Sequence, residues 1–169
     1  MKVSRSLFGI ALGFLAASSL SMAGAGPKPG SLAPDFELKS PQGATTSLSS
    51  LRGRIVILHF WATWCPHCVE EMPLLSELAR EDDPRRVTIL AVNLGEPARK
   101  VSRYLRSRNL SLSVLLDSRG KVARAYGVAG LPSTVVVDAT GRVVTGISMG
   151  SLDREEFRRT LRLAGKVTP

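Results

Sequence analysis

The hydrophobic pattern of the chain alternates between short apolar runs and amphipathic segments. Residues 55–62 form the strongest run, a continuous β-branched and apolar stretch that predicts a strand covered on both faces. Further buried strands are expected at residues 87–93 and 112–116. Apolar residues recur at helical spacing in residues 66–80 and 97–108, which predicts a helix after each of the first two strands.

The two ends of this pattern add antiparallel elements. Two short segments at residues 35–38 and 46–48 flank a turn signal at residues 40–43, which predicts an N-terminal hairpin. A short helix, two strands joined by a turn and a closing helix follow at residues 121–126, 133–138, 142–147 and 152–163. The whole pattern indicates an α/β fold with a mixed central β-sheet flanked by helices.

Two features lie inside the expected helices. Pro73 should interrupt and kink the helix at residues 66–80, because proline lacks the backbone N–H that the helix needs. The helix at residues 97–108 carries an outward stripe formed by Arg99, Arg103 and Arg106. We interpret this stripe as a solvated face rather than a docking surface.

The N-terminal segment resembles a secretory signal peptide. Lys2 and Arg5 precede an apolar core, and small residues around Ala23 suit cleavage, so residues 1–25 are assigned to the signal. The alternative is an uncleaved membrane anchor, although the apolar core is short for a span of about 20 residues. The expected location is therefore the periplasm, with membrane anchoring if the signal stays attached.

The exported part is expected to contain a flexible lead-in at residues 26–34 and one domain at residues 35–166. The full chain has a formal charge of +9, which favours acidic partners or an anionic membrane surface. Nucleic acid is disfavoured, because export separates the chain from it and no recognition motif is present.

Only two cysteines occur in the chain, Cys65 and Cys68. They could form a reactive redox pair, half of a metal site or an inert crosslink. A crosslink that closes a loop of about four residues contributes roughly 2 kcal/mol, against about 3 kcal/mol for fifteen residues. Stability is therefore a poor reason for the pair, and a reactive pair is favoured in an oxidising compartment.

The cysteines lie where the strongest strand gives way to a helix. Pro66 suits the first helical position, and unpaired N–H groups with the helix dipole then favour the Cys65 thiolate. The pKa of Cys65 should therefore lie below the usual value of about 8.5, and His67 would stabilise the thiolate further. Cys68 follows one helical turn later in a more buried position.

This placement divides the labour between the two cysteines. Cys65 is expected to attack a partner disulfide and Cys68 to resolve the mixed disulfide. Glu71 is the expected base for the Cys68 proton, whereas Glu70 should face solvent. His59 is interpreted as a buried structural residue, with a proton relay to Cys68 as the alternative.

Four further residues are candidates for supporting the site. Trp61 and Trp64 are interpreted as packing groups, and Trp64 also lies where it would shape the partner surface. A trans turn proline is the default at Pro132, but a cis bond after Leu131 is the alternative. In the cis geometry the Leu131 backbone would be open to an extended partner chain.

The motif Trp64-Cys65-Pro66-His67-Cys68, a proline five residues later and the downstream Gly130-Leu131-Pro132 together resemble the thioredoxin superfamily. More narrowly, the chain resembles the exported TlpA/ResA-like thiol-disulfide oxidoreductases. The resemblance implies a thioredoxin-like fold in which residues 94–116 are an inserted helix and strand. It also implies Cys65 as the attacking thiol, Cys68 as the resolving thiol, Pro132 as a cis-proline and Glu71 as an active-site acid.

The resemblance further implies a periplasmic, monomeric reductant of exported protein disulfides, such as those of cytochrome c or of an oxidase copper site. Electrons would come from a membrane donor, and no cofactor beyond the Cys65–Cys68 disulfide is expected. His59 departs from the family pattern, since thioredoxin has an aspartate there. Pro132-Ser133-Thr134 differs from the Pro-Glu-Thr of the cytochrome-maturation branch.

Other functions remain open. Pro66-His67 is the dipeptide of the oxidising DsbA family, which would reverse the electron flow. A copper or zinc chaperone would use Cys65 and Cys68 with the two histidines, although structural zinc prefers four ligands. A peroxidase of the peroxiredoxin type would need a Pro-x-x-x-Thr/Ser-x-x-Cys context, which the residues before Cys65 do not supply.

Overall fold

The continuous apolar run forms an interior strand of the sheet. In the computed structural model, which describes residues 26–149 and 153–166, it is strand β3 (Ile55–Trp61). It pairs in parallel with β4 (Val87–Leu94) and antiparallel with β6 (Ser133–Val137). A strand with neighbours on both sides and helices above and below needs apolar residues on both faces, as the sequence predicts.

Seven strands make one mixed sheet in the order β2-β1-β5-β4-β3-β6-β7. The four remaining strands are β1 (Glu37–Lys39), β2 (Thr45–Ser47), β5 (Ser113–Asp117) and β7 (Val143–Met149). β3, β4 and β5 run parallel, whereas the β1–β2 and β6–β7 hairpins are antiparallel. The predicted mixed sheet with an N-terminal hairpin is confirmed.

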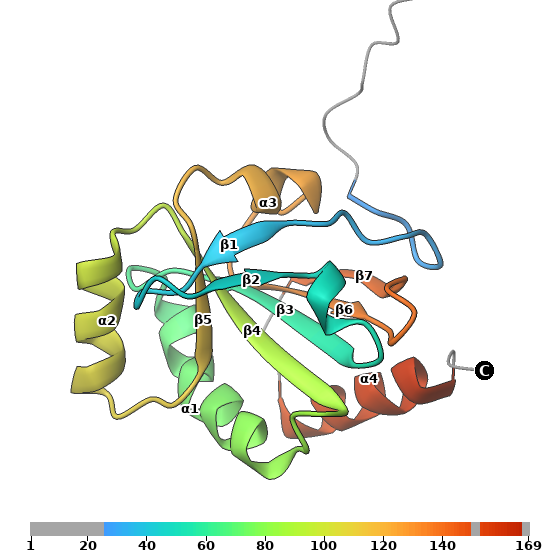
Figure 1. The fold of residues 1–169 in the computed structure, drawn as a ribbon. Coiled ribbons are helices and arrows are strands. Elements are labelled where there is room, and N and C mark those ends of the chain that lie inside the picture. Colours follow the sequence, from blue (N-terminus) through green and yellow to red (C-terminus); the bar gives the residue numbers. More distant parts are fainter. Residues whose placement is uncertain (1–25, 150–152, 167–169) are drawn as a thin grey trace, which may run out of the picture.

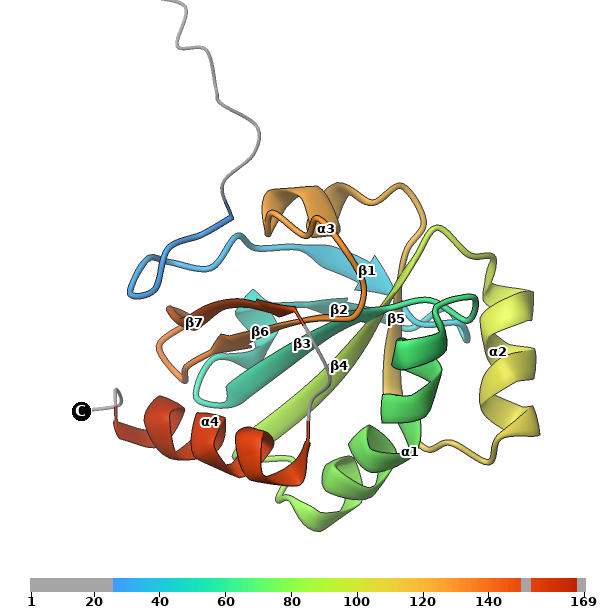
Figure 2. The same ribbon diagram turned by 180° about the vertical axis from the view of Figure 1, so that it is seen from behind.

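Helices cover both faces of this sheet (Figures 1 and 2). The helical elements are η1 (Ser49–Leu51), α1 (Pro66–Glu81), α2 (Ala98–Ser107), α3 (Lys121–Ala125) and α4 (Arg154–Lys166). α1 and α4 lie on one face and α3 on the other, while α2 and β5 form the predicted insertion. α1 runs through Pro73 as one helix, so the expected interruption does not occur.

Alternation along β3 separates two hydrophobic cores. Ile57 and Trp61 point to the core beneath α1, α2 and α4, whereas Val56, Leu58 and Phe60 point to the core beneath α3. Each of these side chains is almost completely buried, whereas Ile55 at the start of the strand is half-buried. Full burial of one such side chain stabilises the fold by about 1.5–3 kcal/mol. Because side chains alternate, residue 59 must face α1.

The lead-in expected at residues 26–34 lies against the β6–β7 hairpin. Gly30 and Ala33 donate backbone hydrogen bonds to Val143 and Gly141, at 2.7 and 3.0 Å. The predicted signal peptide at residues 1–25 lies outside the described residues. In the part of the chain that the structure describes, no helix is long and apolar enough to cross a membrane.

Candidate active site

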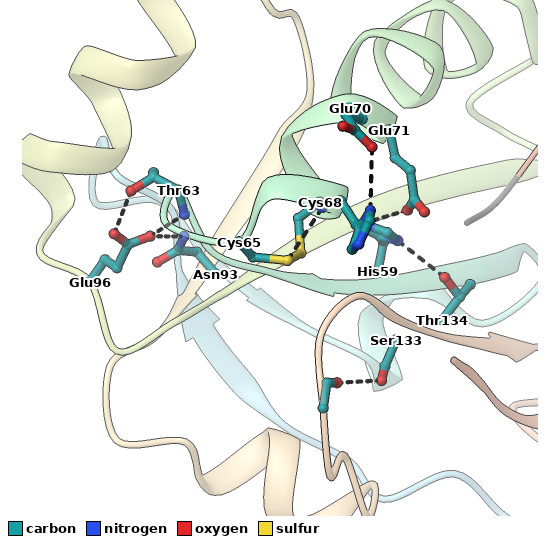
Figure 3. Close-up of a disulfide and its surroundings, with 12 residues drawn as sticks. His59, Thr63, Cys65, Cys68, Glu70, Glu71, Asn93, Glu96, Ser133 and Thr134 are labelled. Atoms are coloured by element: carbon teal, nitrogen blue, oxygen red, sulfur yellow. Dashed lines mark hydrogen bonds and ion pairs between the residues drawn. A yellow bond between two sulfur atoms is a disulfide. The ribbon is translucent and has the colours of Figure 1, made fainter. Parts of the chain in front are cut away.

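The two cysteines form a disulfide where β3 leads into α1 (Figure 3). Cys65 is the N-cap of α1, and its sulfur accepts a hydrogen bond from the Cys68 backbone N–H at 3.3 Å. Pro66 occupies the first helical position, where its missing N–H costs nothing. The helix therefore begins at the attacking sulfur, and its free N–H groups and dipole favour a thiolate there.

The disulfide is almost covered by protein. Cys65 retains 5% of its surface, whereas Cys68 retains none. A partner sulfur can therefore approach only on the Cys65 side. This asymmetry fits Cys65 as the attacking thiol and Cys68 as the resolving thiol.

The two tryptophans differ in environment. Trp61 is fully buried with its ring 5.4 Å from the ring of Tyr104, so it is a packing group. Trp64 is 65% exposed, and the packing interpretation is wrong for this residue. It follows the last residue of β3 by three positions and belongs to the loop before α1, where its side chain is no longer held by the sheet.

His67 lies on the solvent side of α1. Its side chain is 77% exposed, and its Nδ1 lies 3.4 Å from Oε2 of Glu70, which is also exposed as predicted. The ring therefore contacts Glu70 on the exposed side of α1, where solvent screens interactions between charges. Stabilisation of the Cys65 thiolate by His67 stays a prediction.

A buried polar group lies on the α1 side of the sheet, beneath Cys68. His59 is fully buried, and its Nδ1 lies 3.1 Å from Oγ1 of Thr134, its register partner on β6. Its Nε2 lies 3.5 Å from Oε2 of Glu71, which projects from α1 and is 5% exposed. Burial lowers the pKa of His59 to about 4, so the ring is neutral at neutral pH. Figure 3 shows His59 between Thr134 and Glu71.

A second buried carboxylate, Glu96, holds the loop that joins the end of β3 to Cys65, which we call the cysteine loop. Its oxygens accept hydrogen bonds from the Thr63 backbone N–H at 2.7 Å and hydroxyl at 2.6 Å, and from the Asn93 amide at 2.8 Å. Lys100 completes the cluster with an ion pair of 2.7 Å. Burial alone would raise the pKa of Glu96, but the hydrogen bonds from Asn93, Lys100 and Thr63 outweigh it and lower the pKa to about 2.

Glu96 is not among the site residues predicted from the sequence. A signal was available, since Glu96 follows the carboxyl end of β4, and the carboxyl ends of parallel strands meet at one edge of the sheet. The cysteine loop follows the carboxyl end of β3 at the same edge. Thr63 lies two residues before Cys65, so Glu96 positions the loop that carries the attacking sulfur.

The Leu131–Pro132 peptide bond is cis. Pro132 is buried and precedes β6, and the Ser133 hydroxyl donates to the Gly130 carbonyl at 2.6 Å. Within residues 26–149 and 153–166, the Leu131 backbone makes no hydrogen bond outside the strand ladders. In the same ranges no three His, Cys, Asp or Glu side chains gather to ligate a metal.

Comparison with known proteins identifies the family. The AhpC/TSA family model matches residues 29–145. The ResA thiol-disulfide oxidoreductase of Geobacillus thermodenitrificans is 39% identical over 132 residues, which cover 78% of this chain and 75% of the relative. The chain belongs to the AhpC/TSA family. Within that family it is a ResA-like thiol-disulfide oxidoreductase, as the resemblance of its motifs implied.

Solved structures of proteins named as thioredoxins or thioredoxin-family members share the fold. A thiol:disulfide interchange protein of the thioredoxin family from Chlorobium tepidum superposes with a TM-score of 0.70 at 29% identity, covering 84% of this chain and 99% of that protein. An exposed lipoprotein thioredoxin from Streptococcus pneumoniae gives a TM-score of 0.68 at 31% identity, with coverage of 76% and 98%. The thioredoxin-like fold and an oxidoreductase activity on thiols and disulfides are thereby shown.

Proposed function

We propose that this protein is a periplasmic reductant of disulfides in exported proteins. The observation that carries the exchange chemistry is the asymmetric disulfide, in which Cys65 reaches the surface at a helix start and Cys68 is sealed beneath it. The reducing direction is the part of the proposal that the trapping experiment below decides. The substrates are cysteine pairs that must be reduced before they bind haem or copper, as in cytochrome c or an oxidase copper site. A membrane protein supplies the electrons.

The reaction consists of two exchanges. In the dithiol form, the Cys65 thiolate attacks one sulfur of the partner disulfide, forms a mixed disulfide and releases the other partner sulfur as a thiolate. Cys68 then loses its proton and attacks the Cys65 sulfur, which releases the second partner thiolate. The partner disulfide gains two electrons, and the Cys65–Cys68 dithiol is oxidised to the disulfide.

The proton of Cys68 needs a buried acceptor, because Cys68 is sealed from water. Glu71 lies three residues after Cys68 on α1, and side chains three residues apart are neighbours on a helix surface. Its Oε2 faces Nε2 of His59 at 3.5 Å. We assign Glu71 as the acceptor of the Cys68 proton. His59 holds the Glu71 carboxylate in place and shares that proton.

The environment of His67 supports the direction of electron flow. A cation close to the attacking sulfur would stabilise the thiolate and make the pair more oxidising, as in DsbA. The His67 side chain is exposed and lies 3.4 Å from the Glu70 carboxylate, so a proton on the ring would be shared with that carboxylate and screened by solvent. The Pro66-His67 dipeptide is therefore compatible with a reductant.

The backbone beside the disulfide supports an extended substrate. Leu131 precedes the cis Pro132, and its N–H and C=O make no hydrogen bond outside the strand ladders of the described residues. A partner segment that lies along Leu131 would pair with these groups as an added strand. Its cysteine would then lie beside Cys65.

A trapping experiment tests the proposal. The reduced Cys68→Ala variant is mixed with a peptide that carries an oxidised Cys-x-x-Cys-His haem-attachment motif. We expect a stable mixed disulfide on Cys65, seen as a mass adduct, while the reduced wild-type protein converts the peptide to its dithiol. The Cys65→Ala variant is the matched control and should trap nothing. Oxidation of the reduced peptide by the disulfide form would instead show the opposite direction.

A further inference from the structure

A cleft of about 560 Å³ opens beside the active-site disulfide, between the start of α1 and α2. We call it the α1–α2 cleft. The loop and first turn of α1 contribute Trp64, Pro66 and Val69, and α2 with its C-cap contributes Arg103, Tyr104 and Arg108. Figure 2 shows these two helices side by side. Trp64 and Pro66, the residues on either side of Cys65 in the sequence, both line the cleft.

The charges that line the cleft are positive and mostly unneutralised. No carboxylate is among its lining residues. Lys100 is held by the buried Glu96 at 2.7 Å, whereas no carboxylate of the described residues pairs with Arg103 or Arg108. The Arg108 guanidinium lies 5.9 Å from the centre of the Tyr104 ring. The cleft therefore presents two guanidinium groups next to aromatic surface.

The loop side of the cleft is apolar. Trp64 is 65% exposed, although it adjoins the attacking Cys65 in the sequence. Tryptophan and arginine are enriched among residues that dominate binding energy at protein interfaces. The combination of an exposed tryptophan, a tyrosine and two unpaired arginines therefore has the chemistry of a binding surface for an anionic chain.

We propose that the α1–α2 cleft binds an acidic, extended segment of the partner polypeptide next to its reacting cysteine. Carboxylates of that segment pair with Arg103 and Arg108, and an apolar side chain packs on Trp64. This inference rests on the proposed function and names the chemical class of its substrate. It also changes the interpretation of the arginine stripe: Arg103 faces a binding cleft, whereas Arg99 and Arg106 do not line it.

The test compares exchange rates with three peptides. Each carries the same internal disulfide, flanked by Asp/Glu, by Asn/Gln or by Lys residues. The reduced protein should reduce the acidic peptide about tenfold faster than the basic one at low ionic strength. Added salt should shrink this ratio, because it screens surface charge. Both reduction rates are measured on the same protein sample. An inactive fraction therefore lowers both rates equally and does not change their ratio.

Two double variants locate the effect. Arg103→Gln with Arg108→Gln should reduce the acidic-to-basic ratio to about two- to threefold. Arg99→Gln with Arg106→Gln removes the same charge from the same helix outside the cleft, and should retain most of the ratio. An equal fall in both double variants would overturn the proposal, because net charge rather than the cleft would then explain the preference.

Other outcomes are equally decisive. Equal rates for the three peptides would overturn the docking proposal and leave the proposed function intact. Equal rates together with Arg103- and Arg108-dependent binding to phosphatidylglycerol vesicles would assign the surface to a membrane instead. Failure to reduce any peptide and also the small neutral hydroxyethyl disulfide would overturn both the proposed function and the docking proposal.

Discussion

Burial of His59 should make the stability of the fold depend on pH. The histidine is fully buried on β3, and burial lowers its pKa from about 6.5 to about 4. Between these pH values the unfolded chain holds a proton on this histidine and the folded chain does not. The unfolded state therefore binds more protons, and the free energy of unfolding falls as the pH decreases.

The size of the effect follows from the two pKa values. A difference of one pH unit corresponds to about 1.4 kcal/mol, so the full loss is about 3 kcal/mol, of which about 2–3 kcal/mol is reached at pH 4.5. The Glu71 carboxylate lies 3.5 Å from the ring and, when ionised, favours the charged ring. The value of about 3 kcal/mol is therefore an upper limit.

Urea unfolding of the oxidised domain at pH 7 and pH 4.5 measures the loss. We expect His59→Asn to remove most of the pH dependence over this range, whatever its absolute stability. His67→Gln is the matched control, because His67 is the other histidine of the chain and is exposed. It should keep the wild-type dependence. A His59→Asn variant that loses as much stability as the wild type would refute the assignment.

Three further predictions concern the site. Glu71→Gln should slow release of the second partner thiol about 100-fold without slowing attack by Cys65, in single-turnover kinetics; equal slowing of both steps would contradict its role as the acceptor of the Cys68 proton. Glu96→Gln should lower the free energy of unfolding at neutral pH by about 1–2 kcal/mol. Because the pKa of Glu96 is lowered to about 2, the difference from wild type should shrink as the pH falls from 4.5 towards 2 in urea titrations, and a constant difference would contradict the network. Trp64→Ala should change stability by less than about 0.5 kcal/mol, yet slow exchange with a protein substrate about fivefold; a large loss of stability would restore a packing role.

The order of the elements could be predicted because it depends on local patterns. The apolar run of β3 and the helical spacing after Pro66 are visible in a few consecutive residues. The expected helix at residues 97–108 and strand at residues 112–116 differ from α2 and β5 by about one residue at each end. The start of α1 could also be predicted from local sequence, because proline prefers the first helical position.

The buried partners of the site depend on tertiary structure and could not be predicted. The sequence placed His59 inside the core, but it could not show that Thr134 lies opposite it on β6. Glu71 was expected near Cys68 from helical spacing, whereas its approach to His59 depends on how α1 crosses the sheet. The place of Glu96 after the carboxyl end of β4 could have been noticed, but its link to Thr63 joins residues 33 positions apart and is visible only in the folded chain.

Exposure was the least predictable property at the surface. Trp64 follows directly on a buried strand, and its large apolar side chain indicated packing. The loop before α1 turns it outward, and the structure leaves it 65% exposed. The His67 side chain is also exposed, and its ring lies 3.4 Å from the Glu70 carboxylate. Both outcomes follow from side-chain direction, which the sequence pattern does not specify at a helix start.

The reduction potential of the Cys65–Cys68 pair tests the central claim most directly. The protein is equilibrated in defined thiol–disulfide buffers, and its redox state is measured by alkylation of free thiols and mass spectrometry. A reductant of exported proteins should titrate reversibly as a two-electron couple at about −250 mV or below. A value above about −150 mV would make the protein a disulfide-forming oxidant. The absence of any reversible titration would contradict a redox-active pair altogether.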